Sequence, residues 1–327
     1  MSVEELQADG LAGEAVRGLQ FISPMPRLKS DGEEWVSELR RIESLGFDTV
    51  AVSHHVTKGW QLGLVAAMAF AAASTSRLRV LSLVAQNPLQ HPALLAKDIA
   101  TIDRLSGGRV ELGIGAGWLA DDYDALGLTA EAGLQRFARL KESLEIIEQY
   151  FTRDTVNFAG MHYQINGMEA LPVPVQRPRP PILVGAGGPR TLELAGRVAD
   201  IVGIHARMRT GTIDGTTVRE LTADSIQAKI DRVRTAARLA KRPVPRLQFS
   251  CYHVHVTDAA VGPTQRSTWA DVLESEKALL KESPAVLIGT ASECAGRIAE
   301  WSERFGITYW HLGADPESAS LIIDKLR

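Results

Sequence analysis

Residues 106–118 read SGGRVELGIGAGW, a short apolar run that ends in a string of small residues. The run from Arg109 to Ile114 is shorter than an ordinary helix and more apolar than a loop, so we expect a buried strand. Strands of parallel sheets are buried on both faces and therefore read as nearly continuous apolar runs. The stretch predicts a parallel strand that opens directly into a glycine-rich loop.

The same kind of unit recurs on both sides of this stretch, because apolar runs alternate with helical patterns along the chain. Besides 109–114, the strand-like runs are 19–23, 48–53, 78–84, 181–185, 200–204, 247–256 and 308–312. The expected helices are 32–45, 62–75, 92–105, 134–151, 189–198, 225–240, 269–281 and 292–305. Eight strands separated by helices predict a closed (β/α)8 TIM barrel with insertions rather than an open sheet.

Three segments stand apart from this pattern within a single barrel domain expected over 1–327. Residues 1–17 hold several acids and no apolar core, so we interpret them as an N-terminal extension and not a signal peptide. Residues 152–180 predict a small hairpin near 158–165 and a proline-rich crossing. Residues 207–224 are polar and rich in Gly and Thr, which predicts a mobile loop or lid. The helix at 62–75 is apolar nearly all round, so we expect it to be buried.

Composition excludes several function classes. The chain of 327 residues has a net charge of −3, so its composition does not predict a basic surface that would bind nucleic acid. Its apolar runs are too short to span a membrane. The two cysteines, Cys251 and Cys294, lie far apart in no metal-ligand spacing, so we expect no disulfide framework and a cytoplasmic protein. We expect a small-molecule substrate and no nucleic-acid or membrane partner; the oligomeric state, a homodimer included, stays open.

Polar residues at the ends of the second and sixth strands are the first site candidates, because loops after barrel strands build the active site. Neighbours in a strand face opposite ways, so one of His54 and His55 should point into the mouth. Acid–base work, cofactor contact and structural hydrogen bonding all remain open for them. A metal is disfavoured because only Asp121 and Asp122 are near candidates to complete a ligand set. His205, ending the sixth strand, predicts a phosphate or substrate contact or a plain rim residue.

Two glycine-rich loops are the second group. Small residues at 113–117 let a flat ring or a phosphate approach the backbone, and Trp118 would stack on a ring or plug the rim. No third glycine opens a helix there, so a dinucleotide fingerprint is excluded. Residues 185–188 feed directly into a helix N-terminus, which favours a phosphate site, with a tight turn as the alternative. Residues 83–88 are, by themselves, a strand that runs into an Asn-Pro turn.

Taken in this order, the segments resemble the luciferase-like monooxygenase superfamily, and within it the F420-dependent oxidoreductases. The resemblance spans 19–312 and is strongest at 106–118, 87–92 and 180–188. It implies a non-proline cis peptide at Leu83-Val84, behind the ring of a bound cofactor. It also implies cofactor contacts, including phosphate loops, at Gly115, Ala116, Gly117, Asp121, Gly185, Ala186, Gly187, Gly188 and His205.

Several positions depart from the relatives. His55 matches a ring-contacting His, but His54 stands where relatives have an Asp. We therefore expect His55 to act as a hydrogen-bond donor first and as an acid second. Trp118 stands where sugar-phosphate dehydrogenases of the family have an acid, which argues against that chemistry. Ala116 stands where luciferases often carry an Arg for the flavin phosphate, which argues against FMN.

The resemblance implies an oxidoreductase that moves a hydride between the deazaflavin coenzyme F420 and a small organic substrate, with His55, His54 and Trp118 as candidate catalytic residues. The alternative is an FMN-dependent monooxygenase that uses reduced flavin and O2. A third interpretation is a barrel that binds its cofactor without catalysis. The substrate and the direction of hydride transfer stay open.

Overall fold

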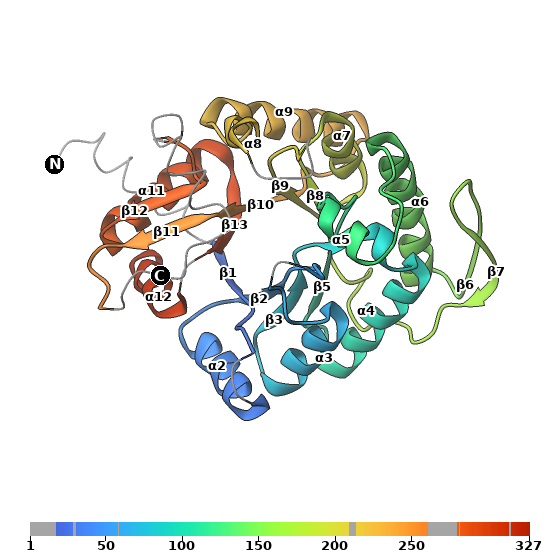
Figure 1. Ribbon diagram of the computed structural model, residues 1–327, viewed down its shortest axis with the longest axis horizontal. Helices are drawn as coiled ribbons and strands as arrows, with labels where there is room; N and C mark the ends of the chain where they lie inside the picture. The colour runs from blue at the N-terminus through green and yellow to red at the C-terminus, as the bar shows by residue number, and fades with distance from the viewer. Residues whose placement is uncertain are drawn as a thin grey trace.

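The strands close into a (β/α)8 barrel, as predicted (Figure 1). The computed structural model describes residues 18–28, 31–57, 59–208, 214–260, 280, 282–313 and 315–327. The barrel strands are β1 (Gln20–Pro24), β2 (Thr49–Val52), β3 (Arg79–Ser82), β5 (Val110–Gly115), β8 (Ile182–Ala186), β9 (Ile201–Ile204), β10 (Arg246–Cys251) and β13 (Ile307–Leu312). All neighbouring pairs are parallel, and β3 closes the barrel by pairing with β5.

Helices surround the strands on the outside. They are α2 (Gly32–Ser44), α3 (Leu64–Ser74), α4 (Pro92–Ser106), α5 (Ala120–Ala125), α6 (Gly133–Thr152), α7 (Pro189–Val198), α8 (Gly215–Arg219), α9 (Ala223–Leu239), α11 (Ala291–Phe305) and α12 (Pro316–Leu326), with the 3-10 turn η1 (Asn87–Leu89). Local sequence sets their ends: Asp31 caps α2 by accepting from the backbone N–H of Glu34, and Gly107 ends α4 in the left-handed conformation.

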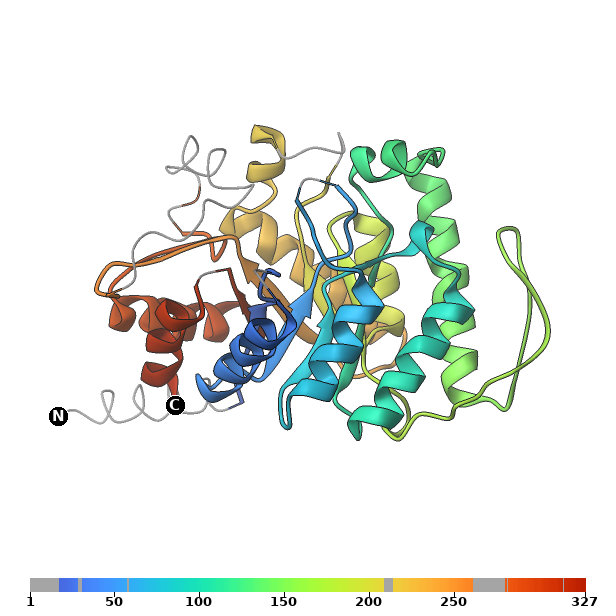
Figure 2. The ribbon, with the colours of Figure 1, turned by 60° about the horizontal axis from the view of Figure 1, so that its bottom comes forward.

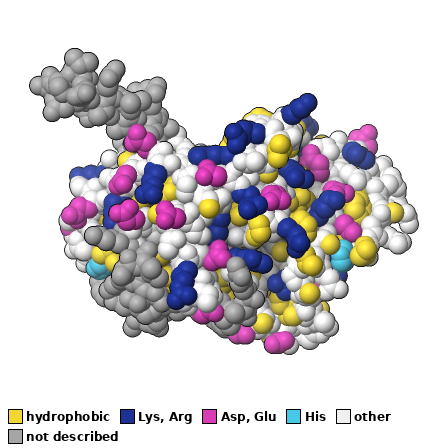
Figure 3. Space-filling view, turned by 90° about the horizontal axis from the view of Figure 1, so that it is seen from above, with side chains coloured by type: hydrophobic (Ala, Val, Ile, Leu, Met, Phe, Trp, Pro, Cys, Tyr) yellow, Lys and Arg dark blue, Asp and Glu magenta, His cyan; other side chains and the backbone are white. Residues whose placement is uncertain are grey.

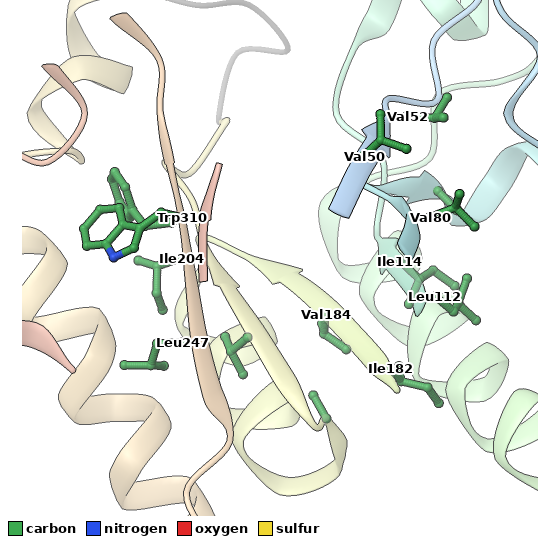
Figure 4. Close-up of a cluster of buried hydrophobic side chains, with 14 of the residues drawn as sticks. Val50, Val52, Val80, Leu112, Ile114, Ile182, Val184, Ile204, Leu247 and Trp310 are labelled. Carbon is green, nitrogen blue, oxygen red and sulfur yellow. The ribbon is translucent and has the colours of Figure 1, made fainter. Parts of the chain in front are cut away.

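Alternation along each strand divides the apolar residues into two groups. One group packs between the strands and the helices, and Figure 4 shows its members projecting from the barrel strands, among them Val50, Val80, Leu112, Val184 and Trp310. The other group fills the barrel interior: Ile22, Ala51, Leu81, Leu183, Ile201 and Tyr309. Because side chains alternate with a period of two, a residue two positions from an interior one also faces inward.

Three sequence expectations need correction. The run 247–256 is not one strand: β10 stays in the barrel, and β11 (His253–Val256) leaves it to pair with β12 (Val286–Gly289), a strand that the sequence did not predict. Helix α3 is not buried all round, because Phe70 is 51% exposed on its outer face. The segment 207–224 is not a loop throughout, because α8 forms there with Asp214 as its N-cap.

The segment 152–180 does hold a hairpin outside the barrel, formed by β6 (Thr155–Ala159) and β7 (Gln164–Glu169), which projects from the side of the molecule in Figure 2. The expected extension at 1–17 and most of the expected helix at 269–281 lie outside the described residues. Basic and acidic side chains are interspersed over the face drawn in Figure 3. Within the described ranges, no helix has the length and apolar character needed to cross a membrane.

Candidate active site

The loops after β2 and β5 bring a histidine and an aspartate together at the C-terminal mouth of the barrel. His55 lies three residues after β2, and Asp122 lies in α5, the short helix after β5. His55 Nδ1 is 2.6 Å from Asp122 Oδ2, and the Asp122 side chain is fully buried. The loop after β2 and helix α5 lie along the same upper edge of the molecule in Figure 2. An acidic partner for His55 therefore comes from a distant segment, although residue 54 is not an acid.

Asp122 is the centre of a hydrogen-bond network that fixes the loop after β2. Its Oδ1 accepts from the backbone N–H groups of Val56 and Thr57 and from Thr57 Oγ1, at 3.1, 3.2 and 2.8 Å. Its Oδ2 also accepts from Gln86 Nε2 at 2.6 Å. Burial alone would raise the pKa of Asp122, but hydrogen bonds from its neighbours, His55 first, outweigh burial and lower the pKa. Because this carboxylate is ionised near neutral pH and can only accept, His55 Nδ1 carries a proton and its N–H donates a hydrogen bond to Asp122 Oδ2.

Two tryptophans frame the His55 ring. Trp60 stacks on it with ring centroids 5.2 Å apart, and Trp118 meets it edge-on at 5.6 Å. His55 Nε2 has no hydrogen-bond partner among the described residues. Trp118 was expected at this rim from the sequence, whereas Trp60 was not, because its signal there is only an aromatic ring shortly after the histidine pair. The His55 ring thus contacts two aromatic side chains, and its Nε2 atom stays available for a ligand.

His54 is held differently from its neighbour. Its Nδ1 accepts a hydrogen bond from the backbone N–H of Gln86 at 3.2 Å, and its carbonyl accepts from Gln86 Nε2 at 2.6 Å. Burial lowers the pKa of His54, and the adjacent His55 lowers it further, against the attraction of Asp122. His54 is therefore a neutral acceptor that ties the loop after β2 to the strand β4 (Ala85–Gln86).

The peptide between Leu83 and Val84 is cis, as the family resemblance implied. It separates β3 from β4, and both pieces pair with β5. The Val84 side chain points into the barrel: a Cβ added to Gly115 would lie 2.9 Å from Val84 Cγ2, and one added to Gly185 would lie 3.2 Å from Val84 Cγ1. A Cβ on Gly113 would lie 1.9 Å from the Ser82 carbonyl oxygen. These glycines make room for Ser82 and for the Val84 side chain that follows β3, a reason that could not be read from the sequence.

The loops after β8 and β9 meet at the start of α7. Gly188 is the N-cap of α7. Because it has no side chain, it offers no acceptor to the backbone N–H groups of the first helical turn. The Arg207 Nε atom would lie 3.8 Å from a Cβ on Gly188, and the Ala206 carbonyl oxygen 2.4 Å from a Cβ on Gly187. The predicted phosphate loop at 185–188 therefore has an arginine beside it. Arg207 was not selected as a site residue from the sequence.

The remaining predicted residues take different positions. Asp121 is exposed, whereas Asp122 is buried at the site. His205 lies inside the barrel with Nδ1 3.0 Å from the Tyr252 hydroxyl, and burial, aided by nearby Lys229, lowers the pKa of His205 to about 4. Ala116 is half-buried beside the core. Over the described ranges, no group of three or more His, Cys, Asp or Glu side chains is arranged to hold a metal ion.

Comparisons with known proteins point to one family. The family profile described as luciferase-like monooxygenase matches residues 19–282. The chain is 33% identical to the FMNH(2)-dependent dimethylsulfone monooxygenase of Pseudomonas putida over 39% of this chain and 35% of that protein. It is 34% identical to the F420-dependent glucose-6-phosphate dehydrogenase of Amycolatopsis mediterranei over 49% of each chain. These matches span between about a third and half of the curated relatives.

Solved structures share the whole fold. An F420-dependent secondary alcohol dehydrogenase, in complex with an F420–acetone adduct, superposes with a TM-score of 0.72 at 17% identity over 94% of this chain and 97% of that one. A monooxygenase from Streptomyces bottropensis gives a TM-score of 0.71 at 23% identity over 93% and 97%. At these identities the structures show the fold alone. Because the family profile covers most of the sequence, the chain belongs to the luciferase-like monooxygenase family.

Proposed function

We propose that the protein is an oxidoreductase that transfers a hydride between coenzyme F420 and a small organic substrate. The observation that carries this proposal is the His55–Asp122 pair at the barrel mouth, with Nδ1 and Oδ2 2.6 Å apart. F420, when bound, supplies the carbon that accepts or gives the hydride. The protein would supply orientation, a proton and the exclusion of water.

His55 is the proposed proton carrier. A hydride that leaves the carbon of an alcohol must be accompanied by loss of the hydroxyl proton, and the reverse reaction must return that proton. His55 Nδ1 is committed to Asp122, so the exchange would take place at Nε2. The network around Asp122 holds the imidazole in one tautomer and one orientation. His54, already bonded through Nδ1 to Gln86, is better suited to holding the loop.

The end of the barrel at α7 would hold the phosphate of the cofactor. The unbonded N–H groups at the start of a helix attract anions, and Arg207 adds a positive charge beside Gly188. Val84, on the cis peptide, is the residue that we place behind the cofactor ring. These residues fit a ligand with an anionic tail outside the barrel and a flat ring over its mouth.

The surroundings of His55 favour an uncharged substrate. Trp60 and Trp118 both contact the imidazole ring, and Trp60 and Val56 are 45% and 44% exposed. Aromatic and aliphatic side chains here would bind an apolar organic molecule and gain nothing from a phosphate group. This supports the expectation from Trp118 that sugar phosphates are not substrates.

An FMN-dependent monooxygenase is the second candidate, and the observation that favours it is the 33% identity to an FMNH(2)-dependent enzyme. Spectrophotometric titration of the purified protein with F420 and with FMN separates the two. We expect F420 to bind more tightly and to be oxidised or reduced in the presence of an alcohol or ketone. Tighter binding of reduced FMN, with O2-dependent turnover, would favour the monooxygenase. Tight binding without turnover of either cofactor would leave a barrel without catalysis.

A further inference from the structure

One side of the barrel interior carries a group of buried polar side chains. Ile201 and Tyr309 face inward, so alternation places Gly203 and His205 of the β9 segment and His311 of β13 on the same interior side. Gln248 of β10 pairs with Gly203, and a Cβ on Gly203 would lie 2.9 Å from Gln248 Oε1, which confirms that this side chain also points inward. We call His205, Gln248 and His311 the polar wall.

The polar wall carries three buried atoms without a hydrogen-bond partner among the described residues. They are His205 Nε2, Gln248 Oε1 and His311 Nδ1. Two of them converge, because a Cβ on Gly203 would lie 2.9 Å from both Gln248 Oε1 and His205 Nε2. Buried polar atoms are nearly always paired in folded proteins, and leaving them unpaired is costly. A convergent group of such atoms therefore indicates a missing partner.

The hydrogen bonds that the polar wall makes determine whether each unpartnered atom is a donor or an acceptor. Gln248 Nε2 donates to Ser250 Oγ at 3.2 Å, which leaves Oε1 as a free acceptor. The His205 Nδ1 atom is 3.0 Å from the Tyr252 hydroxyl, which can donate to it and leave the proton on Nε2. Burial lowers the pKa of His205 and of His311 to about 4, so both imidazoles are neutral near pH 7. A neutral donor, His205 Nε2–H, beside the acceptor Gln248 Oε1 suits a carbonyl next to an N–H, and it does not suit a phosphate.

The polar wall borders the residue expected behind the cofactor ring. A Cβ on Gly185 would lie 3.2 Å from Val84 Cγ1 and 3.5 Å from His205 Cδ2, so these two side chains flank the same glycine. A flat ring placed against Val84 would therefore bring one edge close to the polar wall. F420 and FMN share a pyrimidinedione ring, whose edge presents a carbonyl, an N3–H and a second carbonyl.

We propose that the polar wall recognises this edge: Gln248 Oε1 accepts a hydrogen bond from N3–H, and His205 Nε2–H donates to the adjacent carbonyl oxygen. His311 Nδ1 is the donor for the second carbonyl. The proposal rests on the proposed cofactor-dependent function, but it is independent of the choice between F420 and FMN. It gives His205 a contact with the ring edge, where the sequence predicted a phosphate or substrate contact or a plain rim residue, and it leaves the cofactor phosphate to the proposed site at α7 and Arg207.

The test is a binding titration, read by absorbance and fluorescence, of F420 and FMN and of their N3-methyl derivatives. Methylation removes the N3–H donor and adds bulk where Gln248 would accept. Wild-type protein should bind each parent cofactor at least about tenfold more tightly than its methyl derivative. Gln248→Met, close in volume but without the acceptor, should lose about tenfold in affinity for the parent and discriminate less between the pair. Gln248→Glu keeps an acceptor oxygen and should discriminate more than Gln248→Met.

Gln149→Met is the matched control, because Gln149 Oε1 is also buried without a partner but belongs to α6, outside the barrel. It should bind as wild type does. Equal affinity of the wild-type protein for parent and methylated cofactor overturns the proposal even if Gln248→Met fails to fold. A folded Gln248→Met variant with unchanged affinity and discrimination also overturns it. Absence of binding of F420 and FMN to the wild type would instead remove the proposed function, and the inference with it.

Discussion

The Asp122 carboxylate lies 2.6 Å from His55 Nδ1, although the two residues are 67 positions apart in the chain. The residue directly before His55 is a histidine, so the sequence suggested that His55 lacks the acidic neighbour of its relatives. The acid instead comes from the helix after β5. The expectation that His55 acts as an acid only in second place therefore loses its basis, because an ionised partner at Nδ1 supports proton transfer at Nε2.

Replacing His55 should separate a proton carrier from a residue that only orients the ring. We expect His55→Ala to lower kcat by about 10²–10⁴-fold with the preferred cofactor, because the proton then has no defined acceptor. His54→Ala should cost less, since His54 holds the loop through Gln86. Steady-state kinetics of both variants test this. Full activity of His55→Ala would contradict the assignment. If the free-energy losses in kcat of His55→Ala and Asp122→Ala simply add up in the double variant, the two residues do not act as a pair.

Asp122 should make stability depend on pH in acid. Its pKa is lowered in the folded protein relative to the usual 3.8, so on acidification the unfolded chain takes up the proton first. The stability that ionised Asp122 contributes is complete above the unfolded pKa and is lost as pH falls through the folded one. Urea unfolding should therefore show the difference between wild type and Asp122→Asn shrinking below about pH 4. Asp121→Asn, with the same change of net charge at the exposed neighbour, is the control; a difference independent of pH would refute the prediction.

The N-terminus of α7 should be sensitive to an added negative charge. Gly188→Asp places a carboxylate at the N-cap of α7, where it can cap the helix and compete with a cofactor phosphate. We expect at least about tenfold weaker cofactor binding without a fall in Tm. In Gly188→Ala the new Cβ would meet only Arg207 side-chain atoms, at 3.8 and 3.9 Å, so this variant should bind the cofactor nearly as tightly as wild type does. Gly187 is a poorer probe, because its Cβ would collide with the Ala206 backbone. Equal affinities for all three proteins would show that the loop is only a turn.

Gly115 and Val84 should be energetically coupled. A Cβ on Gly115 would lie 2.9 Å from Val84 Cγ2, so Gly115→Ala should destabilise the protein by about 1–3 kcal/mol through overpacking. Val84→Ala removes Val84 Cγ2, the atom that the new Cβ would contact. The double variant should therefore be more stable, by at least about 0.5 kcal/mol, than the sum of the two single destabilisations implies. Chemical denaturation of the four proteins measures this coupling. Additive effects would mean that Val84 does not occupy the space that Gly115 leaves.

Local signals in the chain were sufficient for the architecture. Apolar runs such as 109–114 and 200–204, a helix start such as Pro92, and glycine loops at strand ends each depend on a few neighbouring residues, so the sequence alone reveals them. Eight strands alternating with helices then leave a closed barrel as the simplest arrangement. The departure of β11 from the barrel had no such signal, because the alternating pattern of 247–256 is compatible with one continuous strand and only the pairing with β12 divides it.

Local sequence signals determined only part of the candidate site. The sequence by itself placed His55, Trp118 and the loop at 185–188 at strand ends, since position relative to a strand is a local property. It could not choose Asp122 over Asp121, and it could not bring His205 and Gln248 to converge over Gly203. Those choices depend on the direction in which each side chain leaves its element and on which strand ends become neighbours. Both are set only when the barrel closes, because closure brings together residues that no local interaction connects.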